Sequence, residues 1–318
     1  MASYTYETLA AGAEALRAAA IKTACEQAAI PPLPEAQSGQ QKQDVIAIEG
    51  AFAGVPAMFY PFLTMPGPAD FEGILADLET SATVLMTTQN SPDPGLRIPA
   101  PNNDKFSAVT TVGDNLASWS GAAAREFKSQ YLDKLPSQQA GQFNVVVTCM
   151  KLIQQEQAIW TEARKNVADI VNQAIEVLEN MPRRCSKDNW TVAFTVVAAV
   201  AGIATVPLGV AAAGTGILVS LAVADKVAGG ATLLLEDDPP ENRRFEASTA
   251  DGVIREVDRG VKELIARIVE QEGKIAAVFS GANALVQATR DMFVPKRPLL
   301  AKATPANVTD QDMLGFSS

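Results

Sequence analysis

The feature that most constrains this chain is a run of thirty-four residues, 191–224, without a charged side chain. It consists mainly of valine, alanine, leucine, isoleucine and glycine, with Pro207 and Gly209 at its centre. A straight helix of this length would measure about 50 Å, whereas the hydrocarbon core of a bilayer is about 30 Å thick. The proline and glycine therefore predict a bend between two halves of about 17 residues, each spanning roughly 25 Å. We interpret the segment as an apolar hairpin of two helices, and its valine and threonine content also allows a two-stranded tongue.

Three roles fit such a hairpin. It is the buried core of a bundle, a segment sheltered at first and inserted into a bilayer later, or a constitutive membrane anchor. Small residues four apart, such as Ala198 with Gly202, would let the two halves pack closely. For the inserting role, the residues expected to enter the membrane are Val196, Val200, Gly202, Ile203, Val206, Pro207, Leu208, Gly209, Val210, Gly214, Gly216, Ile217, Leu218 and Leu221.

Heptad patterns flank the hairpin on both sides. The first predicts a long helix over about 143–180, because eight of its ten seam positions are apolar: Val146, Met150, Ile153, Gln157, Trp160, Arg164, Val167, Val171, Ala174 and Leu178. The second predicts a helix over about 245–293, with ten of twelve seam positions apolar: Ile254, Val257, Val261, Leu264, Ile268, Gln271, Ile275, Val278, Ala282, Leu285, Thr289 and Met292. Polar seam residues are expected to set the register between helices.

The remaining chain also favours helices, and no segment predicts a strand. Amphipathic stretches over about 6–29, 44–53, 70–88 and 104–118 are separated by proline-rich loops, and an interruption is expected near 136–141. The fold class is therefore all-α, an elongated bundle of long antiparallel helices with the apolar hairpin between the two longest. We expect N-terminal helices and loops over 1–103, a helical turn and long helix over 104–190, the hairpin over 191–235, the C-terminal long helix over 236–294 and a mobile tail over 295–318.

The order of long heptad helix, apolar hairpin and long heptad helix resembles the α-helical pore-forming toxins of the haemolysin E and Cry6 type. The resemblance covers about 143–293 and lies in the pattern, not in a sequence motif. It implies that the long helices form a rod and that the hairpin is a head that enters a membrane after oligomerisation.

A second element has the pattern W-x-G-x-A-A-x-x-F, formed by Trp119, Gly121, Ala123, Ala124 and Phe127. A glycine permits a tight reversal or an unusual φ, the tryptophan caps the open end of a hairpin, and alanines allow close helix approach. The element is similar to the WXG100 (ESAT-6-like) proteins of type VII secretion, which implies a helical hairpin with the motif at its turn. The family's Tyr-x-x-x-Asp/Glu signal is absent, and the merely structural turn is the alternative.

Composition argues against an enzyme. The chain has no histidine, which excludes Ser-His-Asp and Cys-His catalysis and removes the commonest metal ligand. Its three cysteines lack zinc spacing, and no phosphate-binding loop is present, so we predict no catalytic residues, metal, cofactor or small-molecule substrate. We expect buried, reduced thiols, with one disulfide after export as the alternative.

Charge limits the partners. A net charge of −10 excludes nucleic acid as a natural ligand and gives no attraction to anionic lipid, so any membrane contact has to be hydrophobic. The N-terminus lacks a basic region followed by an apolar run, so export would use a route without a Sec signal peptide.

Together these features lead to two functional hypotheses. In the first, a soluble helical protein becomes membrane-active as a pore-forming toxin or secreted effector, with membrane lipid and a homo-oligomer or helical partner. In the second, it is a non-enzymatic, WXG100-like secretion substrate or a structural helical protein, cytoplasmic in the structural case, whose hairpin is permanent core or a partner interface.

Overall fold

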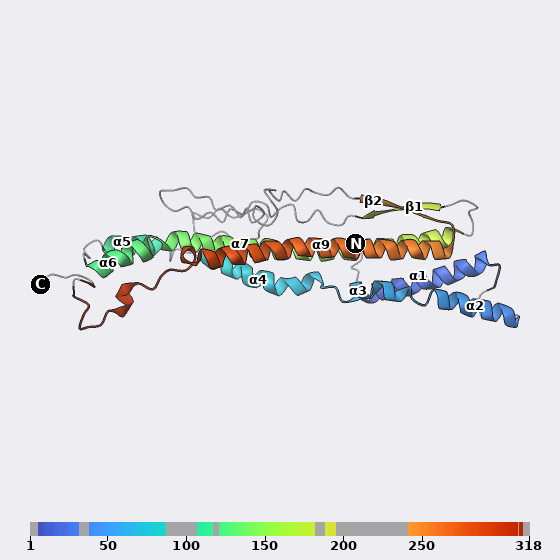
Figure 1. Ribbon diagram of the computed structural model, residues 1–318, viewed down its shortest axis with the longest axis horizontal. Coiled ribbons are helices and arrows are strands. Elements are labelled where there is room, and N and C mark those ends of the chain that lie inside the picture. The colour runs from blue at the N-terminus through green and yellow to red at the C-terminus, as the bar shows by residue number, and fades with distance from the viewer. Residues whose placement is uncertain are drawn as a thin grey trace. The chain divides into compact units, whose positions relative to one another are not determined.

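The fold is an all-α helical bundle with one two-stranded ribbon, in the residues that the computed structural model describes, which are 6–31, 38–86, 107–116, 121–181, 188–194, 241–310 and 312–313. The two longest helices there are α7 (Leu135–Asn180) and α9 (Ala250–Ala288), drawn in green and orange in Figure 1. Both were predicted from their heptad seams. The shorter elements are α1 (Tyr6–Gln27), α2 (Gly39–Ala51), η1 (Pro56–Phe59), α3 (Tyr60–Leu63), α4 (Pro68–Leu85), α5 (Ser107–Asn115), α6 (Ala122–Glu126), η3 (Phe127–Leu132), η6 (Arg290–Met292) and η7 (Leu299–Lys302).

The start of α7 corrects one prediction. We expected an interruption near 136–141, but α7 begins at Leu135 and continues without a break to Asn180. Pro136 lies in the first turn, where a helix has no use for the missing N–H and where the fixed φ of proline suits the helix. The break falls earlier, after the π-helical turn η3, which ends at Leu132.

Two strands contradict the expectation of a strand-free chain. Strand β1 (Asp188–Phe194) pairs antiparallel with β2 (Glu241–Ala247), and Figure 1 shows them side by side. The register places Asp188 opposite Ala247 and Phe194 opposite Glu241. The predicted C-terminal helix therefore begins later than expected, at Ala250. Because β2 is largely polar and its partner lies far away in the sequence, no local alternation of apolar and polar residues marked the pair.

The chain groups into two compact units, and each combines three stretches that are distant in the sequence. The first consists of residues 1–71, 155–201 and 235–274, and the second of residues 72–154, 202–234 and 275–318. Both α7 and α9 contribute to both units.

The core of the first unit contains the apolar side of α1 and parts of the two long helices. The α1 side chains predicted to share one face, those of Leu9, Ala13, Leu16 and Ala20, are all buried. The α1 backbone approaches α7 closely, since a Cβ at Gly12 would lie 3.3 Å from Cγ1 of Val171. The buried positions of the long helices in this unit include Val167, Val171, Ala174 and Leu178 of α7 and Val253, Val257 and Leu264 of α9.

The second unit has a core of its own, which contains Ala82, Met86, Phe143, Val147 and Met150. Its C-terminal segment, where we expected a mobile tail, contacts α6. The backbone N–H groups of Ala123 and Ala124, at the start of α6, donate to the carbonyl oxygens of Asp312 and Met313 at 3.1 and 3.3 Å. The first N–H groups of a helix lack partners within the helix, so these two bonds fix the C-terminal segment to α6.

Candidate functional site

A side chain near the C-terminal end of α1 caps the C-terminal end of α7. The Thr23 hydroxyl, which is buried, donates to the carbonyl oxygen of Leu178 at 2.9 Å. Leu178 lies in the last turn of α7, where carbonyl groups have no partner within the helix. Thr23 therefore satisfies a buried acceptor that would otherwise be unpaired.

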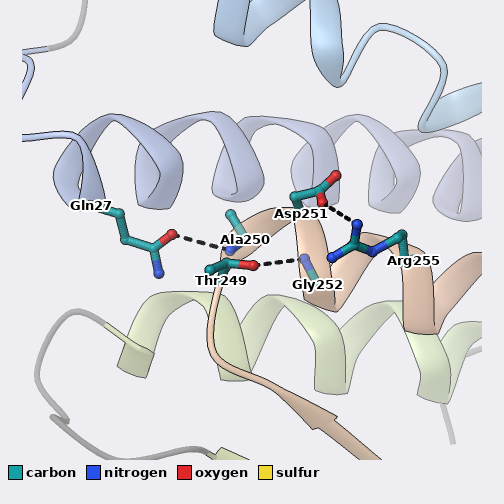
Figure 2. A network of polar contacts seen from close by, with 6 residues as sticks. All are labelled: Gln27, Thr249, Ala250, Asp251, Gly252 and Arg255. Atoms are coloured by element: carbon teal, nitrogen blue, oxygen red, sulfur yellow. Dashed lines mark hydrogen bonds and ion pairs between the residues drawn. The ribbon is translucent and has the colours of Figure 1, made fainter.

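Gln27, one turn further along α1, connects the ends of both long helices. Its Nε2 donates to Met181 Sδ, just after α7, and to the carbonyl oxygen of Ser248, just before α9, at 3.3 Å in each case. Its Oε1 accepts from the backbone N–H of Ala250 at 3.2 Å, the bond drawn in Figure 2. One exposed amide thus holds the point where the chain leaves α7 and the point where it enters α9.

The start of α9 is capped by its own sequence as well. The Thr249 hydroxyl accepts from the N–H of Gly252 at 3.0 Å, while Asp251 pairs with Arg255 at 2.9 Å (Figure 2). A threonine in this position commonly caps the third residue of a helix. Gly252 is packed tightly, since a Cβ there would lie 3.1 Å from the Thr249 hydroxyl oxygen and 3.3 Å from the Ala247 Cβ.

We call Thr23 and Gln27, with the groups that they bind at Leu178, Met181 and 248–250, the clamp. All of its residues belong to the first unit. The β1–β2 ribbon begins at Asp188 and ends at Ala247, next to Ser248 of the clamp, and its other end pairs Phe194 with Glu241. The 46 residues between them, 195–240, therefore leave the ribbon and return to it at neighbouring points. The clamp and the ribbon together fix both ends of this excursion.

Only the first four residues of the predicted inserting segment, 191–194, lie within the described residues. Residues 191–194 of that segment belong to β1 and pair with 241–244, so they are strand and not helix. The residues named for insertion all lie outside the described residues: Val196, Val200, Gly202, Ile203, Val206, Pro207, Leu208, Gly209, Val210, Gly214, Gly216, Ile217, Leu218 and Leu221.

The W-x-G element is described only in part, because Trp119 lies outside the described residues. Gly121 is buried and precedes α6 with φ −63° and ψ 163°, a conformation open to any residue, so the glycine is not required for an unusual φ. Phe127 stacks on Tyr131 with ring centroids 5.1 Å apart. The alanines of the element, Ala123 and Ala124, are buried, as close packing of α6 requires.

Polar residues of the first heptad seam hold a loop. Arg164 donates to the carbonyl oxygen of Met65 at 2.6 Å, and Gln157 donates to that of Pro68 at 3.0 Å. Met65 lies in the connection between α3 and α4, and Pro68 is the first residue of α4. We expected polar seam residues to set the register between helices, and Arg164 and Gln157 instead anchor that connection to α7.

Two further polar features lie on the long helices of the first unit. Burial raises the pKa of Glu272, as do the charge of Glu156 and a hydrogen bond between the two carboxyl groups. Trp160 donates to Glu156 at 2.9 Å. Asn166 of α7 is fully buried, and neither its amide nitrogen nor its oxygen has a hydrogen-bond partner.

The two cysteines among the described residues, Cys25 and Cys149, are both free. Cys25 is buried, and burial, followed by the charges of Glu49 and Glu26, raises its pKa. Burial also raises the pKa of Cys149. A thiol with a raised pKa is a poor nucleophile, so neither residue has the features of a catalytic cysteine.

A shallow hollow of about 360 Å³ lies in the second unit between η3 and the segment after α9. Its lining includes Glu126, Tyr131, Lys296 and Arg297. Lys296 is exposed and already paired with Asp291 at 2.7 Å. The hollow therefore offers a mixed polar surface without a buried charge, and it does not indicate a ligand.

Sequence reasoning missed a second apolar stretch. Among the described residues, one stretch is long and apolar enough to cross a membrane by length and composition, Gly39–Leu85, with a window of mean hydropathy 1.5. It is not one continuous helix, because α2, η1, α3 and α4 are separated at 52–55 and 64–67. The sequence does contain the apolar signal, since Glu49 is the only charged residue in 45–69. The four prolines of this region, however, predicted an irregular or short-helical segment.

Thr23 and Gln27 were missed as well. They stand four residues apart on α1, which is only a weak hint of a polar edge, and their partners lie more than 150 residues away.

Comparisons with known proteins give no match to this chain, whether to a protein-family model, to a curated protein or to a solved structure.

Proposed function

We propose that this protein is soluble at first and then becomes membrane-active, as a pore-forming toxin or secreted effector that inserts the 191–224 segment after oligomerising. The observation that carries the proposal is the pairing of Phe194 with Glu241. It makes 195–240 a closed excursion from the end of a ribbon, and this excursion contains nearly all of the uncharged run. An apolar excursion joined at one point can enter a bilayer without unfolding the helices that carry it.

The clamp supports the same proposal. An inserting segment needs a base that stays folded, because it pulls on the two chain ends that enter and leave it. Thr23 and Gln27 fix these ends through side-chain bonds to 178, 181, 248 and 250. The ribbon adds backbone pairing, which provides partners for strand N–H and C=O groups near a membrane.

The charge balance defines the membrane that the protein would enter. With a net charge of −10, the protein gains nothing from an anionic surface, so zwitterionic lipid is a sufficient target.

Dye release from zwitterionic vesicles tests the proposal. Wild type is expected to release an entrapped dye, and Gly202→Asp is expected to abolish release, because a carboxylate at the centre of a span costs several kcal/mol. Gly273→Asp is the matched control, since the same substitution falls on α9, where a Cβ at Gly273 has no neighbour within 4 Å. The proposal fails if wild type releases no dye at any pH or lipid composition, or if Gly202→Asp releases dye as wild type does.

The second candidate is a WXG100-like secretion substrate or a structural helical protein, whose hairpin is permanent core or a partner interface. The burial of Gly121, Ala123 and Ala124, and the attachment of 312–313 to α6, favour a structural role for this turn. Export of Trp119→Ala from a host with a type VII system distinguishes a WXG100-like secretion substrate from a structural helical protein. Unchanged export argues against the WXG100 part, and lost export with a normal circular dichroism spectrum supports it.

A further inference from the structure

We propose that Glu156 of α7 and Glu272 of α9 form a proton-controlled latch between the two long helices, which acidic pH closes and rising pH opens. The inference is independent of the proposed function, because it concerns the packing of the helices and not the 191–224 segment. It assigns a regulatory role to two carboxyl groups that the proposed function does not use.

The contact between the two residues requires a proton. Their side-chain carboxyl groups are joined by a hydrogen bond. An ionised carboxylate only accepts hydrogen bonds, so this bond forms only when one of the two groups is protonated. Trp160 already donates to Glu156 at 2.9 Å, which makes Glu156 the acceptor and leaves the proton on Glu272.

Partial burial keeps that proton in place. Both glutamate side chains are half-buried, and burial, followed by the charge of Glu156 and the bond itself, raises the pKa of Glu272. Once the proton is lost, two like charges face each other at a site that water reaches only in part, and they repel each other. Loss of one proton therefore converts an attraction between α7 and α9 into a repulsion.

The latch lies where both long helices leave the first unit. Glu156 follows the first residue of the stretch 155–201, and Glu272 precedes the last two residues of the stretch 235–274. Opening of the latch therefore frees the helices at the edge of the unit, where they have packed neighbours in that unit on one side only.

The turns beside the latch are weakly held. Gln155 is buried, and its side-chain oxygen has no hydrogen-bond partner. On α9, Gly273 is exposed, and a Cβ there would have no neighbour within 4 Å. An unpaired buried oxygen and a glycine inside a helix both cost stability, which leaves this point sensitive to one hydrogen bond.

The ionisable groups beside the latch on α9 are engaged elsewhere. Lys274 lies two residues after Glu272 and pairs with Glu270 at 2.9 Å, so this lysine is occupied by another carboxylate. Arg267 stands five residues before Glu272, which places it on another side of the helix.

The groups on α7 are directed away as well. Glu162 pairs with Lys165 at 3.7 Å. Lys151 stands five residues before Glu156, on another side of the helix.

The connection that Gln157 binds to α7 contributes two more ionisable groups. The Asp70 carboxylate accepts from the backbone N–H of Gly67, and Arg164 donates to the carbonyl oxygen of Met65 at 2.6 Å. Both groups serve this connection, so the charge of the latch is set by its own two carboxyl groups.

Hydrogen exchange of the full-length protein, measured by mass spectrometry and corrected for the intrinsic pH dependence of exchange, tests the latch. The range is about pH 5.5 to 8, above the ordinary glutamate pKa of about 4.3. The closed state holds a proton that the open state releases, so rising pH favours opening. Exchange in peptides covering 154–160 and 268–276 should speed up by at most tenfold per pH unit and level off above the raised pKa of Glu272.

Two glutamine variants and one matched control identify the groups responsible. In Glu272→Gln and in Glu156→Gln, an amide group donates to the remaining carboxylate without an added proton, so exchange should no longer depend on pH. Glu270→Gln is the control, since it makes the same change on α9 in a residue that pairs with Lys274, and it should keep the wild-type pH dependence.

The proposal is overturned if the corrected exchange of wild type does not change with pH. It is also overturned if both glutamine variants keep the wild-type slope, or if Glu270→Gln loses it. A merely structural role of the two carboxyl groups would change the level of exchange in the variants and leave its slope with pH unaltered, which contradicts the latch.

Discussion

Replacement of Thr23 by valine is the most direct test of the clamp. The substitution keeps the branched shape at Cβ and removes only the hydroxyl group that donates to Leu178 at 2.9 Å. Both residues are buried, so water does not replace the lost donor for the Leu178 carbonyl group. A buried acceptor without a partner costs about 1–3 kcal/mol, more than the net value of an average hydrogen bond.

This free-energy cost should appear as more frequent local unfolding at the end of α7 and the start of α9. A loss of about 1–3 kcal/mol corresponds to a roughly 5- to 150-fold larger population of the opened state. Hydrogen exchange measured by mass spectrometry should therefore speed up by that factor in peptides covering 176–181 and 248–254. Peptides of the second unit should be unchanged.

A matched control separates the clamp from a general effect of losing a hydroxyl. In Thr161→Val the hydroxyl that is removed bonds only to Gln157 of the same helix, at 2.7 Å and with exposed surroundings. This variant should exchange as wild type does at 176–181. If Thr23→Val also exchanges at the wild-type rate, the clamp does not hold the end of α7 and the reasoning is refuted.

Four further substitutions follow from the packing and charges of the long helices. Asn166→Leu should raise the free energy of unfolding by about 1–3 kcal/mol in urea, because it removes two buried polar atoms without partners. Glu272 has a raised pKa in the native state, so its contribution to the free energy of unfolding falls as the pH rises through that pKa. Glu272→Gln should abolish this fall and stabilise the protein at neutral pH. Urea unfolding at a series of pH values measures both effects. Gly141→Ala should lower the melting temperature, because the new Cβ would lie 3.1 Å from the Phe293 ring, whereas Gly273→Ala meets open space and should raise it.

The helices were largely predictable, because one face of each is apolar over many turns. The α1 positions Leu9, Ala13, Leu16 and Ala20 were identified by their spacing and are buried. The end of α7 at Asn180 was also predicted, since a proline follows directly after Met181. Its start was not, because Pro136 was interpreted as a break and not as a first-turn residue.

The ribbon and the clamp were beyond local reasoning. Strand β2 has the sequence Glu-Asn-Arg-Arg-Phe-Glu-Ala, whose composition resembles that of a helix surface, and only its pairing with β1 makes it a strand. Thr249, with its capping bond to Gly252, was a readable start signal for α9 that the apolar periodicity obscured. The partners of Gln27 are set by tertiary packing, so no local pattern identifies them.

The central claim is that the excursion between Phe194 and Glu241 enters lipid. The most direct measurement places an environment-sensitive fluorophore on Val210→Cys, in full-length protein whose three native cysteines are replaced by serine or alanine. Vesicles with quenchers in the acyl chains should shift its emission to the blue and quench it, while a label at the exposed Val269 of α9 should stay unquenched. If the label at position 210 keeps the same emission with and without vesicles that the protein binds, the segment does not enter the bilayer and the account is contradicted.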